Sequence, residues 1–395
     1  MPVEYYNPWA KIYTFESPTK VIFGINALND IGEVLKGFNP KKILLFTDKV
    51  IRETEPAKEF ISTLSSKRFE VEVFASEVKE PTVDMVNASV EFVRSKKQGI
   101  VIGMGGGSVM DQAKIAAALA KNEGEAEEYA GVNKVPHRGL PLVLVPTTAG
   151  TGAETSKNAV FLGRRGKSVI TTPNMLADLA IIDPIVTISL PPSPTAFTGM
   201  DALSHAIEGI MSLNSNPMVM AVALEAISLI NTNLSIAYLN GSDIRARFNM
   251  CIAATLGGLS LSAVMVLGHS VAYTLDHFEL PHGLGCAIAL PHVMKFNASA
   301  IPEKMKRVAR ALGLNDSRID DPIQAAAYAV NRVKGLNELL GIPISLQSMG
   351  VEKEKAAELA DECFAKYPKP NNPRRYFKDD LVKLYEQLWS GDLEM

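Results

Sequence analysis

Short apolar runs alternate with helix-like segments in the first half of the chain. Val71–Ala75 alternates apolar and polar residues as a half-buried strand does, whereas Val83–Lys96 repeats valine at helical spacing. The predicted strands are Ile43–Thr47, Val71–Ala75, Gly99–Gly103 and Pro141–Val145, and a further helix is expected from Val109. Because strands that alternate with helices form parallel sheets, we predict an α/β domain with helices on both faces of its sheet.

The pattern changes after Asp183-Pro184. The Pro- and Ser-rich stretch 189–195 (SLPPSPT) is typical of a break in regular structure, and almost no segment beyond it alternates. The segments with helical character are Asp201–Met211, Pro217–Tyr238, Arg245–Leu275, Ile323–Leu340 and Lys353–Lys366. We therefore predict two domains, an α/β domain over residues 1–187 and an all-helical domain over residues 188–395.

One stretch of the second domain, residues 251–275, contains no Asp, Glu, Lys or Arg. Its length would allow it to span a bilayer, but it also holds several glycines and serines and His269. A helix that is apolar all round is buried either in protein or in lipid. We expect a wholly buried helix pair inside a soluble domain, and no membrane span.

Composition narrows the class of protein. The 395 residues carry 40 Lys and Arg against 43 Asp and Glu, a net charge of −3, which gives no electrostatic footprint for nucleic acid or an anionic membrane. The three cysteines form no C-x-x-C pair and fit a reducing compartment. The N-terminal residues lack the apolar run of a signal peptide, so we expect a cytoplasmic protein.

A glycine-rich turn, residues 103–111 (GMGGGSVMD), lies between a predicted strand and a predicted helix. Glycines let the backbone approach a phosphate, and the amides of a helix N-terminus point at its charge. The pattern is not G-x-G-x-x-G, because Ser108 takes the last place, and no Gly-Lys-Ser/Thr of a P-loop follows. The turn predicts phosphate binding, with a tight turn that binds nothing as the alternative.

A second loop, residues 146–154 (PTTAGTGAE), follows the predicted strand Pro141–Val145. Its threonine hydroxyls and backbone amides are suitable donors for phosphate, ribose or carboxamide groups. Loops rich in Thr and Gly are common, so this segment alone is equally consistent with an ordinary turn.

The strongest chemical signal lies in the helical half. Asp201 and His205 stand at i and i+4 of a predicted helix and share one face. His269 lies in the uncharged stretch, and His282 follows soon after it. One carboxylate and three imidazoles can hold a divalent metal and leave a position open for substrate. A single buried histidine is more often a hydrogen-bonded core residue, and for His292 we expect a structural or outer-sphere role.

Taken together, these segments resemble the iron-containing (group III) alcohol dehydrogenases. The motifs that carry the resemblance are, in order, GGGSVMDQAK, PTTAGTGAE, TGMDALSHAIE, the step from Gly268 to His269, and LPHGLGCAIALPHV. The resemblance runs from about Lys20 to about Asn297. It implies an α/β N-terminal dinucleotide-binding domain and an all-α C-terminal metal-binding domain, the dehydroquinate synthase-like architecture, with a cleft between them.

The resemblance also implies roles for individual residues. The metal, most often Fe(II) and in some relatives Zn(II), would be bound by Asp201, His205, His269 and His282. The residues expected to contact the cofactor are Gly105, Gly106, Gly107 and Ser108 at the pyrophosphate, Thr147 and Thr148 near the phosphates and nicotinamide, Asp48 at the adenosine ribose, and also Asp111 and Lys167. Since a carboxylate at the ribose repels a 2′-phosphate, we predict NAD(H) over NADP(H). The family forms dimers through N-terminal strands, so we expect a homodimer or larger homo-oligomer that uses Tyr13–Gly24.

One position departs from the family pattern. Many members carry a second histidine four residues after the one that matches His269, and here Tyr273 occupies that place. In those relatives the extra histidine is a candidate proton relay. Tyr273 or His277 can take this role, and the alternative is that Tyr273 only packs against its surroundings.

The resulting hypothesis is an alcohol dehydrogenase or aldehyde reductase that acts on a small alcohol or aldehyde. The metal acts as a Lewis acid on the substrate oxygen, and hydride passes between the substrate carbon and C4 of the nicotinamide. A dehydroquinate synthase-like lyase is a second hypothesis, but it needs a Lys and Arg cluster for a phosphorylated substrate. The nearest basic group, Arg164, Arg165 and Lys167, falls in the cofactor domain. A binding protein without enzymatic activity is the third hypothesis.

Overall fold

The computed structural model describes residues 12–77, 80–96, 98–316 and 319–395, which form two compact units. The N-terminal unit comprises Ser17–Pro192 and Asn240–Gly258, and the C-terminal unit comprises Ser193–Leu239 and Leu259–Met395 with a short N-terminal stretch. We predicted a single domain boundary near residue 187. In the structure, residues 240–258 also belong to the N-terminal unit. Residues 1–11, on which we predict no signal peptide, lie outside the described residues.

A parallel sheet of six strands in the order β1-β9-β6-β4-β2-β3 forms the centre of the N-terminal unit. Its strands are β1 (Lys20–Phe23), β2 (Lys42–Asp48), β3 (Glu70–Ser76), β4 (Ile100–Gly105), β6 (Leu142–Pro146) and β9 (Leu179–Ile182). A second sheet, in the order β5-β8-β7, contains β5 (Gly131–Val132), β7 (Asn158–Gly163) and β8 (Gly166–Thr171). The four predicted strands are confirmed as β2, β3, β4 and β6, whereas the other five strands were not predicted.

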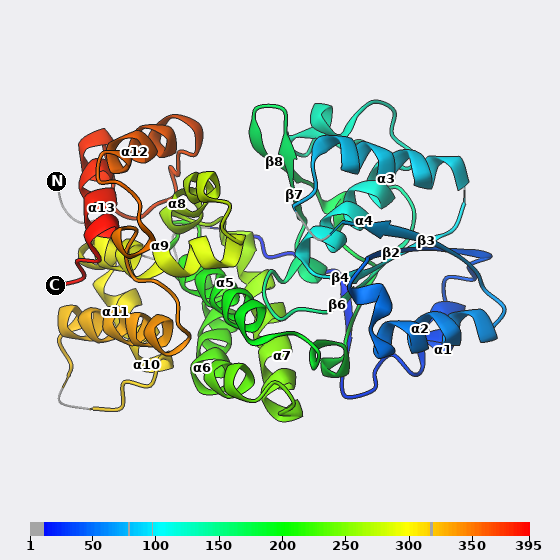
Figure 1. Cartoon of the computed structure of the whole chain (residues 1–395), viewed down its shortest axis with the longest axis horizontal. Coiled ribbons are helices and arrows are strands. Elements are labelled where there is room, and N and C mark those ends of the chain that lie inside the picture. The colour runs from blue at the N-terminus through cyan, green and yellow to red at the C-terminus, as the bar shows by residue number, and fades with distance from the viewer. Residues whose placement is uncertain (1–11, 78–79, 97, 317–318) are drawn as a thin grey trace. The chain divides into compact units, whose positions relative to one another are not determined.

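Helices cover both faces of the six-stranded sheet, as Figure 1 shows. They are α1 (Ile31–Lys36) and α2 (Glu55–Ser66) on one face and α3 (Val83–Lys96) and α4 (Gly107–Leu119) on the other. Along β2, Ile43 and Leu45 pack with α1 and α2, while Leu44 and Phe46 pack with α3 and α4. Successive side chains of a strand point to opposite faces, so a strand covered on both sides must be apolar throughout.

The carboxyl ends of three central strands meet at one edge of this sheet. Strand β2 ends at Asp48, β4 at Gly105 and β6 at Pro146. The backbone amide of Thr147 donates to the Gly105 carbonyl at 3.0 Å, which joins the two loops that follow β4 and β6. Ligands of open α/β sheets bind outside the carboxyl ends of the strands, so this edge is where a nucleotide is expected.

Helix α7 (Ile244–Ser260) returns to the N-terminal unit, where it packs against the loop after β6. The Thr255 hydroxyl donates to the buried Glu154 carboxylate at 2.8 Å, and the Thr155 hydroxyl donates to the Thr255 carbonyl at 3.2 Å. A Cβ atom on Gly258 would lie 2.3 Å from the Gly152 carbonyl oxygen, so the two backbones touch. The loop 146–154 is therefore held in part by a helix far away in the sequence.

The described residues of the C-terminal unit form helices and loops but no strand. Its helices are α5 (Pro192–Met211), which starts at the last residue of the N-terminal unit, α6 (Pro217–Leu239), α8 (Leu267–Thr274), α9 (His282–Asn297), α10 (Pro302–Ala311), α11 (Pro322–Leu339), α12 (Lys355–Lys366) and α13 (Lys378–Ser390). The predicted break over residues 189–195 ends earlier than expected, because α5 already begins at Pro192. Proline fits the first turn of a helix, where its missing N–H has no intrahelical partner.

The helical segment Arg245–Leu275 is divided into two helices, as expected for the helix pair over residues 251–275. Helix α7 ends at Ser260, and α8 begins only at Leu267. Between them Val264 has a positive φ of 62° and is 49% exposed, so the segment is not wholly buried. Within the described residues, α6 is the one unbroken helix long and apolar enough to cross a membrane, a test that core helices of soluble proteins also pass.

His292 on α9 is a buried core residue, 2% exposed. Its Nε2 lies 3.2 Å from the Ile344 carbonyl oxygen, to which it donates as the neutral imidazole. Burial lowers the pKa of His292 to about 4, because the imidazolium would lose its hydration. This placement supports the expected structural role.

The depressed pKa of His292 predicts a loss of stability in acid. The unfolded chain takes up the proton first, near pH 6.5, so the free energy of unfolding falls as the pH drops from there to about 4 and then levels off. The full loss is roughly 3 kcal/mol. Urea unfolding of metal-free protein at pH 7 and pH 4 should show this loss in the wild type and less of it in His292→Gln. Equal losses in both proteins would contradict the assignment.

Candidate metal centre and coenzyme site

Helix α5 places the first two predicted metal ligands on one face. Asp201 and His205 are separated by one helical turn, and Asp201 Oδ1 lies 3.6 Å from His205 Nε2. Both side chains are buried, at 3% and 5% exposure. The Ser260 hydroxyl donates to the His205 carbonyl at 2.9 Å and fixes this turn of the helix.

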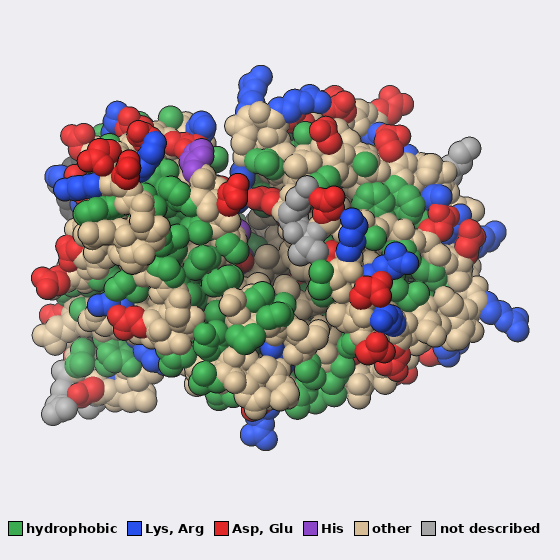
Figure 2. Space-filling model, viewed as in Figure 1, with side chains coloured by type: hydrophobic (Ala, Val, Ile, Leu, Met, Phe, Trp, Pro, Cys, Tyr) green, Lys and Arg blue, Asp and Glu red, His purple; other side chains and the backbone are tan. Residues whose placement is uncertain are grey.

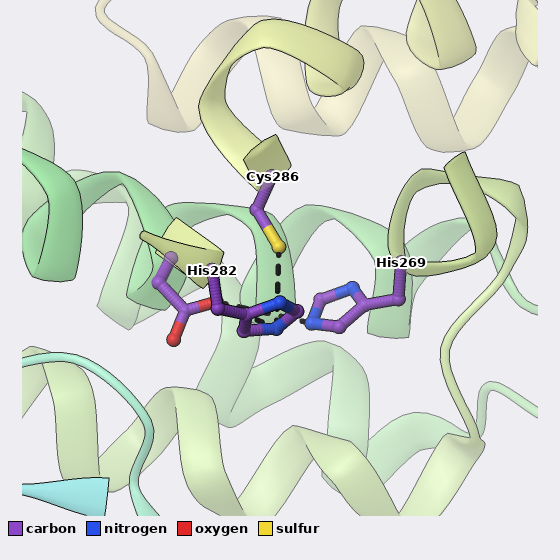
Figure 3. A group of neighbouring side chains, drawn as sticks. His269, His282 and Cys286 are labelled. Atoms are coloured by element: carbon purple, nitrogen blue, oxygen red, sulfur yellow. Dashed lines mark hydrogen bonds and ion pairs between the residues drawn. The ribbon is translucent and has the colours of Figure 1, made fainter. Parts of the chain in front are cut away.

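Helices α8 and α9 bring two more imidazoles to the same carboxylate. Asp201 Oδ1 lies 3.8 Å from His269 Nε2 and 4.0 Å from His282 Nε2. The His205 and His269 rings stack with their centroids 4.8 Å apart. Figure 3 shows His269 and His282 pointing toward a common centre. The structure therefore gathers all four predicted ligands around one point.

These separations fit a shared cation better than hydrogen bonds. Atoms that bind one ion at about 2.0–2.2 Å in tetrahedral geometry lie roughly 3.3–3.6 Å from one another. Asp201 Oδ1 and His269 Nε2 are buried and make no hydrogen bond with any described residue. Each such orphan costs about 1–3 kcal/mol. A divalent cation would satisfy both atoms, so the donor set fits the implied metal.

The charge state of Asp201 suits a ligand. Burial by itself favours a higher pKa for this carboxyl group, because it penalises the ionised form. The three facing imidazoles, together with a hydrogen bond from the Cys286 thiol, outweigh burial and lower the pKa of Asp201 below its ordinary value. The carboxylate is therefore ionised near neutral pH and available to a cation.

Glu208 is a member of the site that the sequence analysis missed. Its Oε1 lies 2.7 Å from His269 Nδ1, and its Oε2 accepts the His269 backbone amide at 3.3 Å. With Nδ1 donating to Glu208, the lone pair of His269 sits on Nε2, which faces Asp201. Glu208 lies three residues after His205 and seven after Asp201, so helical spacing alone puts it on the ligand face.

Two glycines allow the close approach of these elements. A Cβ atom on Gly268 would lie 2.4 Å from Glu208 Oε1, and one on Gly283 would lie 2.3 Å from the Phe197 carbonyl oxygen. A side chain at either position would push α8 or the start of α9 away from α5. The close approach of these helices thus explains why glycine stands beside His269 and beside His282.

Cys286 also reaches the ligand cluster, which the sequence analysis did not foresee. It lies one turn after His282 on α9, and its Sγ is 3.5 Å from His282 Nε2. The donor atoms of Asp201, His269, His282 and Cys286 all lie within 4.8 Å of one another. Figure 3 shows the sulfur directed at the His282 ring.

The two relay candidates lie in different surroundings. The Tyr273 ring stacks on His282 with centroids 5.7 Å apart and meets the edge of His269 at 6.4 Å. His277 instead pairs with Glu362 at 2.6 Å, and its side chain is 60% exposed. Tyr273 therefore contacts the ligand histidines, whereas the contacts of His277 among the described residues are with Glu362.

The predicted phosphate-binding turn and the threonine loop lie against each other in the N-terminal unit. Gly106 is the N-cap of α4, and a Cβ atom on Gly107 would lie 2.6 Å from Thr151 Cγ2. At the end of β2, Asp48 Oδ1 accepts the backbone amides of Val50 and Ile51 at 2.8 and 2.7 Å. The residues that the structure brings to this edge are Asp48, Gly105, Gly106, Gly107, Ser108, Thr147 and Thr148.

Asp111 and Lys167 have protein partners instead. Asp111 Oδ2 accepts the Val160 amide at 2.9 Å, which ties α4 to β7, and burial raises the pKa of Asp111 to about 6. Lys167 Nζ lies 3.4 Å from Glu80 Oε1, and its side chain is 3% exposed. Their expected cofactor contacts stay predictions, and for Asp111 the geometry favours a structural role.

Comparison with known proteins gives a consistent result. The chain is 34% identical to long-chain-alcohol dehydrogenase 1 of Geobacillus thermodenitrificans over 94% of this chain and 95% of that protein. The crystal structure of a 1,3-propanediol oxidoreductase matches with a TM-score of 0.91 and 31% identity, covering 96% of this chain and all of that one. Sulfoacetaldehyde reductase from Bifidobacterium kashiwanohense, solved with NAD+, matches with a TM-score of 0.87 and 28% identity over 97% and 100% of the two chains.

Two family models cover nearly the whole molecule. The model described as iron-containing alcohol dehydrogenase matches residues 18–184, and the model of the C-terminal part of the same family matches residues 195–389. Their boundary falls where the sheet-containing part gives way to α5. The chain belongs to the iron-containing alcohol dehydrogenase family of metal-dependent NAD(H) oxidoreductases.

Proposed function

We propose that this protein interconverts a small alcohol and its aldehyde with NAD(H), at a divalent metal held by Asp201, His205, His269 and His282. The observation that carries the proposal is the cluster in which three imidazole Nε2 atoms lie 3.6–4.0 Å from one oxygen of the buried Asp201 carboxylate. When bound, the metal supplies Lewis-acid polarisation and the nicotinamide supplies or accepts the hydride. The family match favours this reaction over the lyase alternative.

The protein groups at the cluster set its charge. Asp201 brings one negative charge, while neutral imidazoles bring none, so a divalent cation held there keeps a net positive charge. That charge favours an oxyanion over a neutral hydroxyl nearby. Imidazole and carboxylate donors suit both Fe(II) and Zn(II), and we propose Fe(II) as the native metal because of the family.

The coenzyme is proposed to lie on the carboxyl edge of the six-stranded sheet, with its pyrophosphate at Gly105–Ser108 and the loop of Thr147 and Thr148 beside it. The solved relative that contains NAD+ supports this choice of coenzyme. Asp48 uses Oδ1 for its own turn, and its Oδ2 makes no hydrogen bond with a described residue. This oxygen suits a ribose hydroxyl and repels a 2′-phosphate, which favours NAD(H).

We also propose a cytoplasmic homo-oligomer that associates through the N-terminal strand. Strand β1 is at an edge of its sheet, and Phe23 at its end and Ile25 just beyond it are 58% and 54% exposed. Acidic and basic side chains are interspersed over the face drawn in Figure 2. This mixed charge supports our proposal that the protein has no nucleic-acid or membrane partner.

The reaction class is tested by following NADH oxidation with a panel of short aldehydes. Anaerobic Fe(II)-loaded protein should consume NADH, and chelator-treated protein should not. His205→Ala should lose metal and lower the rate by about 10²-fold or more, since Lewis-acid stabilisation is worth several kcal/mol. The exposed loop histidine provides the control His137→Ala, which should behave as the wild type. Near-normal metal content and activity in His205→Ala would refute the metal centre.

Tyr273 is proposed as the proton relay in preference to His277, because it contacts two ligand histidines. Tyr273→Phe keeps the ring but loses the hydroxyl. Turnover should fall by about 10²-fold, the low end of general acid–base contributions, while metal content stays normal. The control is Tyr238→Phe on α6. A pH–rate profile of Tyr273→Phe identical to that of the wild type would leave Tyr273 as a packing residue only.

Glu208 is proposed to orient His269. Glu208→Gln removes the negative charge but keeps a hydrogen-bond acceptor, so His269 should stay in place with a less basic Nε2. We expect metal affinity to fall by about tenfold, within the range for outer-sphere partners of metal-bound histidines. Competition with a chromophoric chelator measures this affinity, and the exposed Glu225→Gln on α6 is the matched control. Equal affinities of Glu208→Gln and the wild type would contradict this role.

A further inference from the structure

The metal centre offers five side chains with potential donor atoms, one more than the four that the proposed function uses. Asp201, His269 and His282 are common to two possible sets of four. One set is completed by His205 from α5 and the other by Cys286 from α9. In the second set, all four donor atoms lie within 4.8 Å of one another.

The position of the Cys286 sulfur fits that of a metal ligand. Its Sγ lies 3.5 Å from His282 Nε2, the same nitrogen that faces Asp201 Oδ1 at 4.0 Å. Two donors of one ion, one nitrogen at about 2.0 Å and one sulfur at about 2.3 Å, lie roughly 3.5 Å apart at a tetrahedral angle. The spacing of His282 and Cys286 by one helical turn points both side chains to the same side of α9.

Cys286 differs from the other two cysteines of the chain in its neighbours. All three thiols are reduced and buried. Cys363 lies on α12 beside Tyr385, and Cys251 lies on α7 in the N-terminal unit. Within the described residues, the only group of potential metal-binding side chains of this kind contains Cys286.

We propose that Cys286 is a further ligand of the metal centre, and that its thiolate binds a soft divalent ion, Zn(II) in particular, together with Asp201, His269 and His282. The inference rests on the proposed metal centre. On binding, the sulfur–metal bond forms and the thiol proton leaves to solvent. Thiolate favours Zn(II) over the harder Fe(II), so Cys286 biases the choice of metal toward Zn(II).

Coordination by Cys286 also changes what the centre can do. The added thiolate cancels the net positive charge that Asp201 alone leaves on a divalent ion. With four protein donors from this set in place, the ion resembles a closed structural site more than an open catalytic one. The Zn(II) form of this protein should therefore be tightly held but a weaker catalyst than the Fe(II) form.

The test replaces the metal with Co(II), whose bond to a thiolate gives a charge-transfer absorption band in the near ultraviolet. Wild-type protein with one Co(II) per chain should show this band, and Cys286→Ser and Cys286→Ala should lose it. Cys363→Ser, which alters a buried thiol elsewhere in the same unit, should keep the band. X-ray absorption of the Zn(II) form should show one sulfur neighbour at roughly 2.3 Å.

The affinities complete the test. Cys286→Ser should bind Zn(II) at least about tenfold more weakly than the wild type, with a smaller change for Fe(II). Wild-type protein that binds one Co(II) without the band, and one Zn(II) without a sulfur neighbour, would overturn the role of Cys286 and leave the metal centre intact. Failure of the wild type to bind either ion would overturn the metal centre, and the proposal for Cys286 with it.

Discussion

The C-terminal unit is organised around one electrostatic constraint, a buried carboxylate that three imidazoles face without forming hydrogen bonds to it. Asp201 contributes Oδ1 to every one of these contacts, at 3.6 to 4.0 Å. An ionised carboxylate away from water is costly unless a positive charge compensates it. Helices α5, α8 and α9 must therefore hold their relative positions closely, and the glycines beside His269 and His282 make that closeness possible.

Much of the fold and part of the metal centre could be predicted from the sequence, because the patterns that indicate them involve residues close together in the chain. The central residues of β2, β4 and β6 are apolar since both faces of these strands are covered, and Asp201 and His205 reveal a shared face by their spacing. Helix α3 was predicted with the bounds that the structure has, Val83–Lys96. Three separate helices carry the four ligands, so residue type and the spacing of Asp201 and His205 only suggested a divalent metal site, and the family resemblance supplied the assignment of each ligand.

What the sequence did not reveal depends on contacts between distant segments. Strand β1 pairs with β9, more than 150 residues later, so neither short strand has a strong pattern of its own. A helix pair was expected in the uncharged stretch 251–275, but not the exposed turn at Val264 between α7 and α8. Glu208 and Cys286 stand at helical spacing from predicted ligands, and an extension of the i, i+3 and i+4 argument from Asp201, His205 and His282 would have found both.

The return of α7 to the N-terminal unit has a consequence for how this chain can be divided. A fragment that ends near residue 187 would contain the whole six-stranded sheet but lack residues 240–258. Glu154, buried at 2% exposure, would lose the Thr255 hydroxyl, and Gly152 would lose the backbone that lies against it. The nucleotide-binding half is thus not a module that a single cut in the gene can release, and recombination between relatives would have to exchange α7 together with the first half.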